Sequence, residues 1–303
     1  MSDISPYTAR NPARGNAHRV RDVDYYINEW GDPDDPLIMF LHGWGDSGAT
    51  FQFVVDALAR RWHVIAPDWR GFGRTFHRAT GYWFPEYLAD LDDLLSKYSP
   101  TAPVRLVGHS MGGNIGGLYA GAMPERVRAF VNIEGFGLVD TSPDEAPARY
   151  REWLQRSREV PGFTRFSGIE ALSRHIAGRS PGMSRAQARF VAEAWAVEGP
   201  DGLVLRADPV HKLPNAVLYR RAEAEACWRN VTAPVLLVAG ADSPVLEAVG
   251  GRPGDRNLPL PFPDKRTIII EECGHMVHFE APGPLAAAIE DFFHASSQSD
   301  SCK

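Results

Sequence analysis

The sequence predicts an α/β protein built on a mostly parallel, doubly wound sheet with a helical insertion. Short apolar runs alternate with amphipathic segments along most of the 303 residues, a pattern typical of parallel strands joined by helices. Several runs are nearly continuous in Val, Ile and Leu, as strands buried on both faces require. The alternation stops between about residues 135 and 230, where one helical segment follows another.

Seven short apolar runs are the predicted strands, at residues 19–29, 37–41, 62–66, 104–107, 128–133, 235–239 and 267–270. The amphipathic segments between and after them are the predicted helices, at residues 49–60, 84–98, 114–123 and 284–294. The stretch at 250–263 is rich in Gly and Pro and is predicted to be an exposed loop.

The interrupted region has helical sequence in series, without buried-strand runs, at residues 144–160, 169–177, 184–197 and 215–228. Such an insertion is most simply a cap over the sheet. We therefore expect a core of residues 18–134 and 231–295, a helical cap of residues 135–230, and polar tails at 1–17 and 296–303. The cap's aromatic side chains either line an apolar substrate pocket or pack the cap against the core: Trp153, Phe163, Phe166, Phe190, Trp195, Tyr219 and Trp228.

Composition and charge narrow the class of partner. The net charge of −6, without a Lys/Arg cluster, argues against nucleic acid or an anionic membrane surface. The polar start of the chain has no signal-peptide pattern, and no apolar run approaches the roughly 20 residues that span a bilayer. Three scattered cysteines form neither a disulfide framework nor a zinc site. We expect a cytoplasmic protein that acts on a small molecule, and its oligomeric state stays open.

A candidate nucleophile, Ser110, lies in the segment Gly108–Gly112, directly after the apolar run 104–107 and before helix-forming sequence. A serine at the tip of such a turn adopts a sparsely populated backbone conformation, and the flanking glycines let strand and helix pass close to each other. The hydroxyl then projects clear of the backbone, near the free N–H groups of a helix N-terminus. The strand before it and the helix after it are the context that a nucleophile at this turn requires.

A serine hydroxyl needs a base, and the base needs an orienting carboxylate. In a parallel sheet both belong on loops at the carboxyl ends of later strands. His275 follows the run 267–270, and Asp242 follows the run 235–239, so we expect these two residues to be the base and the acid. Glu134, at the end of the run 128–133, is the alternative acid.

Other polar residues near these strand ends are expected to be structural. His278 lies three residues after His275 and is expected to support its loop, whereas His109 points away from the chemistry on the turn. Asp68 is expected to fix a loop together with Arg70, and His42 to brace the loop that follows the run 37–41.

Acyl transfer also needs hydrogen-bond donors for the developing oxyanion. One expected donor is the backbone N–H of Met111, the residue after the serine. The second is the backbone N–H of Trp44, in the Gly-rich loop after the run 37–41, where the glycines let the backbone approach the serine. The indole of Trp44 either walls the acyl pocket or has only a packing role.

Together these motifs resemble the α/β-hydrolase fold superfamily, over about residues 20–295. The matching segments are His42-Gly43, Asp68 with Gly71-Phe72-Gly73, Gly108-His109-Ser110-Met111-Gly112-Gly113, Asp242 and Gly274-His275. The resemblance implies a triad of Ser110, His275 and Asp242, a cap after the sixth strand, and hydrolysis without a cofactor. The serine nucleophile disfavours the relatives that use aspartate, such as haloalkane dehalogenases and epoxide hydrolases.

The expected activity is cleavage of carboxylic esters through an acyl-enzyme, on an apolar or aromatic substrate. Hydrolysis of a carbon–carbon bond in a vinylogous diketone and cofactor-free perhydrolase chemistry use the same residues and stay open. The first of these needs cationic cap groups for a substrate carboxylate, for which the cap offers Arg149, Arg151, Arg174 and Arg189. A ligand-binding receptor on the same fold is the alternative that is not an enzyme. Neither a metal site nor a cofactor is expected, because ligand spacing and a phosphate-loop lysine are absent from the sequence.

Overall fold

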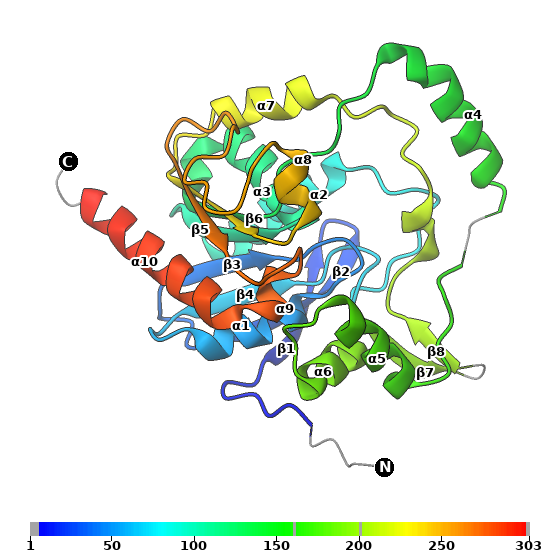
Figure 1. Cartoon of the computed structure of the whole chain (residues 1–303), viewed down its shortest axis with the longest axis horizontal. Helices are drawn as coiled ribbons and strands as arrows, with labels where there is room; N and C mark the ends of the chain where they lie inside the picture. The colour runs from blue at the N-terminus through cyan, green and yellow to red at the C-terminus, as the bar shows by residue number, and fades with distance from the viewer. Residues whose placement is uncertain (1–5, 160–161, 200–201, 301–303) are drawn as a thin grey trace.

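An eight-stranded sheet forms the centre of the computed structural model, which describes residues 6–159, 162–199 and 202–300 (Figure 1). Its strand order is β1-β2-β4-β3-β5-β6-β9-β10. The strands are β1 (Arg14–Val20), β2 (Val23–Trp30), β3 (Leu37–Leu41), β4 (His63–Pro67), β5 (Val104–His109), β6 (Val127–Ile133), β9 (Val235–Gly240) and β10 (Lys265–Ile270). The β1–β2 and β2–β4 pairings of this sheet are antiparallel, and its other pairings are parallel.

The strand order reverses at β3, and this reversal positions the site. From β3 the chain crosses to β4 on one side and then returns to β5 on the other. At their carboxyl ends β3 and β5 lie in register, with Leu41 opposite Gly108. The loops that follow these strands therefore lie side by side, which is where open α/β sheets bind their ligands.

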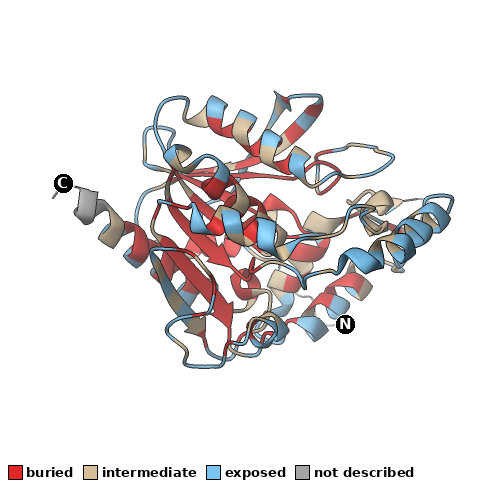
Figure 2. Ribbon diagram, turned by 90° about the horizontal axis from the view of Figure 1, so that it is seen from above, coloured by how far each residue is buried: buried red, intermediate tan, exposed pale blue. Residues whose placement is uncertain are grey.

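Helices cover both faces of the sheet because successive side chains of the strands point to opposite sides. In β3, Met39 and Leu41 pack on one face, whereas Ile38 and Phe40 pack on the other. The first face is covered by α2 (Pro85–Tyr98), α3 (Met111–Ala122) and α7 (Arg221–Arg229). The second is covered by α1 (Gln52–Ala57), α9 (Val277–Glu280) and α10 (Pro282–Asp300). The strands form the buried centre between these layers (Figure 2).

The insertion, which is the chain between β6 and β9, carries α4 (Ala146–Arg156), α5 (Ile169–Arg179), α6 (Arg185–Trp195) and α7, with a hairpin of β7 (Ala196–Gly199) and β8 (Gly202–Leu205). Side chains of α5 and α6 form a third apolar cluster with Phe53 of α1 and Phe279 of α9. In contrast, α4 projects away from the sheet, and all its residues are at least partly exposed (Figure 1). Packing therefore holds α5 and α6 against the core but leaves α4 at the periphery.

The structure confirms the predicted fold class and shifts some boundaries. The run 19–29 is a hairpin rather than one strand, because the chain turns at Arg21, whose φ is +50°. The edge strand β1 extends into the segment expected as a tail, where its exposed side chains gave no apolar pattern. At the other end α10 continues to Asp300, through most of the second expected tail. Residues 1–5 and 301–303 of those tails lie outside the described residues.

Inside the insertion the hairpin of β7 and β8 was not predicted. Val197 and Val204 in this hairpin are exposed, so the segment lacks the continuous apolar run that marks a buried strand. Across the part of the chain that the structure describes, every helix is too short or too polar to cross a membrane.

Candidate active site

Ser110 lies between β5 and α3 in a strained backbone conformation, with φ of +51° and ψ of −113°. Such a conformation costs about 1–3 kcal/mol and persists only when the surrounding structure imposes it. The Ser110 N–H donates to the Ile133 carbonyl (2.8 Å), and the Ser110 carbonyl accepts from the Asn114 N–H (2.9 Å). A Cβ at Gly112 would lie 2.1 Å from the Leu41 carbonyl oxygen, so the turn closes this tightly only with glycine there. The predicted strand–serine–helix turn is present.

His275 lies between β10 and α9, and its partner is a buried carboxylate. Its Nδ1 is 2.9 Å from Oε2 of Glu134, whose side chain is fully buried. Glu134 follows β6 directly, with φ of +58°. Its Oε1 accepts from the Gly240 N–H (2.8 Å), and its Oε2 accepts from the Ser243 hydroxyl. These hydrogen bonds hold the carboxylate behind the imidazole.

The acid expected from the sequence, Asp242, does not occupy this position. It follows β9 as predicted, and its backbone N–H ties the loop to the Cys273 carbonyl (2.9 Å), but its side chain is exposed. The physical reason is the turn itself, which directs the Gly240 N–H and the Ser243 hydroxyl toward Glu134 and leaves Asp242 exposed at the cavity. The structure therefore corrects the expectation, because the carboxylate in contact with His275 is the alternative, Glu134.

Three further histidines on the loops and strand ends near this site, His42, His109 and His278, are buried. His109 Nε2 donates to the His275 carbonyl (2.9 Å), and His278 Nε2 is 3.1 Å from Oδ2 of Asp46. His42 accepts from the Trp69 N–H (2.8 Å) through Nε2 and donates to the Gly43 carbonyl (2.7 Å) through Nδ1. Burial lowers the pKa of both His42 and His109. Each ring holds a loop of the site.

The loop after β3 brings its backbone against the serine. A Cβ at Gly43 would lie 2.9 Å from His109 Nδ1 and 3.3 Å from the Cβ of Ser110, so only glycine allows this approach without displacement. The next residue, Trp44, is half exposed, and its ring centroid is 6.3 Å from that of Phe163 in the insertion. Met111 is the first residue of α3, where backbone N–H groups have no partner within the helix.

A cavity of about 740 Å³ brings these residues together. Ser110, His275, Trp44 and Asp242 line it from the core, and residues of α5 and α6 line it from the insertion. The lining contributed by the insertion includes Ile176, Arg179 and Trp195. The candidate nucleophile and base therefore share one pocket between the sheet edge and the insertion.

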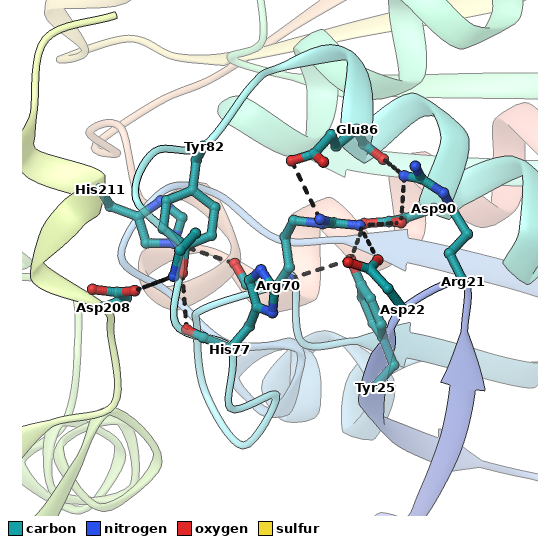
Figure 3. Close-up of polar contacts among 11 residues, drawn as sticks. Arg21, Asp22, Tyr25, Arg70, His77, Tyr82, Glu86, Asp90, Asp208 and His211 are labelled. Carbon is teal, nitrogen blue, oxygen red and sulfur yellow. Dashed lines mark hydrogen bonds and ion pairs between the residues drawn. The ribbon is translucent and has the colours of Figure 1, made fainter.

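A buried arginine organises the loop after β4, although not with the expected partner. Arg70 is bound by Asp90 through Nε (2.6 Å) and Nη2 (2.7 Å), and Glu86 approaches Nη1 at 3.3 Å (Figure 3). Asp68, expected to pair with Arg70, instead accepts from the Gly48 N–H (2.7 Å) and the Arg74 N–H (2.7 Å). The two residues therefore fix different parts of the loop.

The same loop anchors the insertion through His211. This ring stacks on Phe72 at 3.8 Å between centroids and on Tyr82 at 3.5 Å. Its Nε2 donates to the Arg70 carbonyl (3.2 Å) (Figure 3). The Tyr82 hydroxyl also lies 2.9 Å from Oδ2 of Asp208. Burial lowers the pKa of His211 to about 4. The contact consequently depends on a neutral imidazole.

This anchor predicts a loss of stability in acid. Because the folded state lowers the pKa of His211 from 6.5 to about 4, its contribution is complete above about pH 6.5 and is lost as pH falls toward 4. The full loss amounts to about 3 kcal/mol in the free energy of unfolding. The variant His211→Phe keeps an aromatic ring in the stack and removes the titration. We expect its Tm to fall less than that of the unmodified protein between pH 7 and pH 4.5.

Calorimetric scans of both proteins across this range provide the measurement. The matched control is His77→Phe, which changes a histidine in the same loop that is not sandwiched between two rings. Equal acid sensitivity of the His211→Phe variant and the unmodified protein would contradict the assignment.

Comparison with known proteins agrees with this architecture. The family model for the alpha/beta hydrolase fold matches residues 36–282. A serine hydrolase-like protein of Danio rerio is 26% identical over 277 residues, covering 88% of this chain and 84% of that protein. The 2-(acetamidomethylene)succinate hydrolase of Mesorhizobium japonicum is 27% identical over 260 residues, covering 86% and 88%.

Solved structures show the same fold. The thioesterase domain from the curacin biosynthetic pathway has a TM-score of 0.81 at 21% identity, covering 93% of this chain and all of that one. The structure of E-2-(acetamidomethylene)succinate hydrolase has a TM-score of 0.70 at 25% identity, covering 93% and 99%. With its family-model match, its sheet order and these neighbours, the chain belongs to the α/β-hydrolase fold family.

Proposed function

We propose that this protein is a serine hydrolase that cleaves carboxylic esters through an acyl-enzyme, with Ser110 as nucleophile, His275 as base and Glu134 as orienting acid. The observation that carries the proposal is the 2.9 Å contact between His275 Nδ1 and Oε2 of the buried Glu134. His275 lines the same cavity as Ser110, whose backbone is strained. The names of the relatives support hydrolysis in general, and the choice of ester rests on this site.

The geometry supports a two-step mechanism. Glu134 accepts the Nδ1–H of His275, which leaves Nε2 as the free base that takes the Ser110 proton. Ser110 Oγ then attacks the ester carbonyl, and the N–H groups of Trp44 and Met111 stabilise the oxyanion, each by about 3–4 kcal/mol. His275 passes the proton to the leaving alcohol. It next deprotonates a water, which attacks the acyl-enzyme and releases the acid and the serine.

The cavity supports an apolar or aromatic substrate. Its volume of about 740 Å³ falls within the range of pockets that enclose a small organic molecule. Ile176, Trp195 and Phe279 line the wall, and the half-exposed ring of Trp44 lines the cavity as well. In this proposal the insertion is the cap, and its α5 and α6 set which acyl groups enter.

The alternative of carbon–carbon bond hydrolysis has less support. Of the four arginines that the insertion offers for a substrate carboxylate, Arg189 is engaged by Glu170 and by Glu193 (2.9 Å). The described cavity lining includes Arg179 rather than any of those four. The lining also carries the carboxylates Asp242, Glu272 and Glu280, which oppose an anionic substrate.

Labelling with a fluorophosphonate tests the proposal. We expect one molecule of the probe to bond to each protein molecule, with phosphonylation located at Ser110 by peptide mass spectrometry. Hydrolysis of p-nitrophenyl butyrate should be lost in proportion to the labelled fraction. Folded protein that takes up no probe and turns over no ester would instead support a ligand-binding receptor.

A further inference from the structure

A second polar cluster lies directly behind the candidate triad. It consists of His109 at the end of β5, His278 in α9 and Asp46 in the loop after β3, and we call it the His–His–Asp cluster. One nitrogen of each imidazole and one carboxylate oxygen all lie within 4.8 Å of one another. All three residues are at least 97% buried, with exposed fractions of 1%, 0% and 3%. The two imidazole rings are 4.4 Å apart between centroids.

The hydrogen bonds of the two histidines leave one nitrogen of each ring without a partner. His109 Nε2 donates to the His275 carbonyl, and His278 Nε2 faces the Asp46 carboxylate. Because His109 Nε2 carries the ring proton that it donates, the Nδ1 of His109 is a bare acceptor. Both Nδ1 atoms are buried and lack a hydrogen-bond partner among the described residues. Each such atom costs about 1–3 kcal/mol unless a donor or a cation satisfies it.

The Asp46 carboxylate gives the cluster an anionic ligand. Asp46 is buried and accepts from the Trp195 indole (2.7 Å) and the Thr50 hydroxyl (2.9 Å), and His278 Nε2 lies 3.1 Å from its Oδ2. Buried carboxylates in proteins are paired or coordinate metal ions, and this carboxylate stands beside two imidazoles that can coordinate the same ion.

We propose that the His–His–Asp cluster is a binding site for a divalent transition-metal ion of borderline softness, for which Zn²⁺ is the probe. Two imidazoles and a carboxylate are a donor set typical of zinc. Zinc–nitrogen bonds of about 2.0–2.1 Å require the ligand atoms to draw together from their present separation. Asp46 and His109 also line the cavity, which gives an ion a route to the cluster.

Occupation of this site would inhibit hydrolysis, a consequence that rests on the proposed function. His109 adjoins Ser110 in the chain and holds the carbonyl of His275, so drawing His109 toward a metal displaces both reacting residues. Asp46 is hydrogen-bonded to Trp195 of α6, so the ion also changes the environment of an indole that lines the cavity. We expect Zn²⁺ to lower kcat and to change the tryptophan fluorescence over the same concentration range.

Calorimetric titration of the purified protein with ZnCl₂ tests the site without using hydrolysis. We expect one ion per chain, and we expect His278→Gln to weaken binding by at least about 100-fold, as removal of a ligand should. The matched control is His63→Gln, which removes a histidine paired with Glu29 (2.9 Å) away from the cavity. His275→Gln and Ser110→Ala should both bind Zn²⁺ like the unmodified protein, so failure of the metal site and failure of the proposed hydrolysis are distinguishable.

Pulsed electron paramagnetic resonance of the unmodified protein with Cu²⁺ covers the case in which His278→Gln does not fold. Two coordinated imidazoles are expected in the spectrum. A single imidazole, a Zn²⁺ affinity unchanged in His278→Gln, or an affinity lost in His275→Gln would each overturn the proposal.

Discussion

Replacing Glu134 with glutamine is expected to lower kcat for ester hydrolysis by about 10³- to 10⁴-fold, with KM nearly unchanged. The loss corresponds to about 4–5.5 kcal/mol of transition-state stabilisation. Its cause is the tautomer of His275. The amide introduced by Glu134→Gln can donate to Nδ1 of His275, which places the remaining proton on Nε2, so that this nitrogen cannot accept the Ser110 proton. The measurement is steady-state hydrolysis of p-nitrophenyl butyrate at pH 8.

The matched control is Asp242→Asn. Asp242 has the chain position expected of the acid, but its side chain is exposed whereas that of Glu134 is fully buried behind His275. We expect this variant to retain kcat within about 10-fold, a limit set by the modest strength of exposed charge interactions. If kcat fell equally in the two variants, or fell only in Asp242→Asn, the result would contradict Glu134 as the orienting acid and favour Asp242. Circular dichroism and Tm of both variants separate a catalytic loss from unfolding.

The parallel part of the sheet was predictable because its strands are buried on both faces and therefore appear as continuous apolar runs. The strand β9, for example, is buried at all six of its residues, and its bounds differ from the prediction only at Gly240. The strand β1 was missed because its side chains alternate between exposed and partly buried positions and carry few apolar residues. An edge strand paired on one side gives no strong pattern in the sequence.

The placement of Ser110 and His275 in one cavity was predictable because each belongs to a local motif at the end of a strand. The carboxylate in contact with His275 was not, because Glu134 and Asp242 both follow strands at the same sheet edge and both precede His275 in the chain. What separates them is the direction of each side chain, which depends on the positive φ of Glu134 and on the turn that contains Ser243. The available signal was a glutamate placed directly after a strand, at the carboxyl edge of the sheet where the loops of an α/β site gather.

The cavity wall could not be predicted for a related reason. Amphipathic helices indicate that one face is buried, but the partner of that face is set by tertiary packing. Trp195 and Phe163 are both aromatic residues of the insertion, and the sequence did not distinguish their positions. Trp195 lines the cavity and donates a hydrogen bond to Asp46, whereas Phe163 lies beside Trp44. Trp228, another aromatic residue of the insertion, belongs to α7 and is buried in the core.

Ser110→Ala is expected to have the largest effect, lowering kcat by about 10⁶-fold. A residual rate of about 10³-fold over water should remain, because binding and the oxyanion donors do not depend on the hydroxyl. The same steady-state assay measures this loss, and addition of the fluorophosphonate should not change the residual rate. A variant that retains more than about 1% of the activity would mean that another group attacks the ester.

Ser110→Gly separates the chemistry from the backbone strain. Alanine keeps a Cβ at a φ of +51°, so the strain of about 1–3 kcal/mol remains in Ser110→Ala, whereas glycine adopts this conformation freely. Glycine also adds about 0.5–1 kcal/mol of entropy to the unfolded chain, which offsets part of the gain. We therefore expect both variants to be inactive, and the glycine variant to be more stable than the alanine variant by about 1 kcal/mol. Denaturant unfolding measures this difference in the free energy of unfolding. A more stable glycine variant would mean that the conformation that projects the serine hydroxyl lowers the stability of the fold. A less stable glycine variant would mean that the surrounding hydrogen bonds impose no strain.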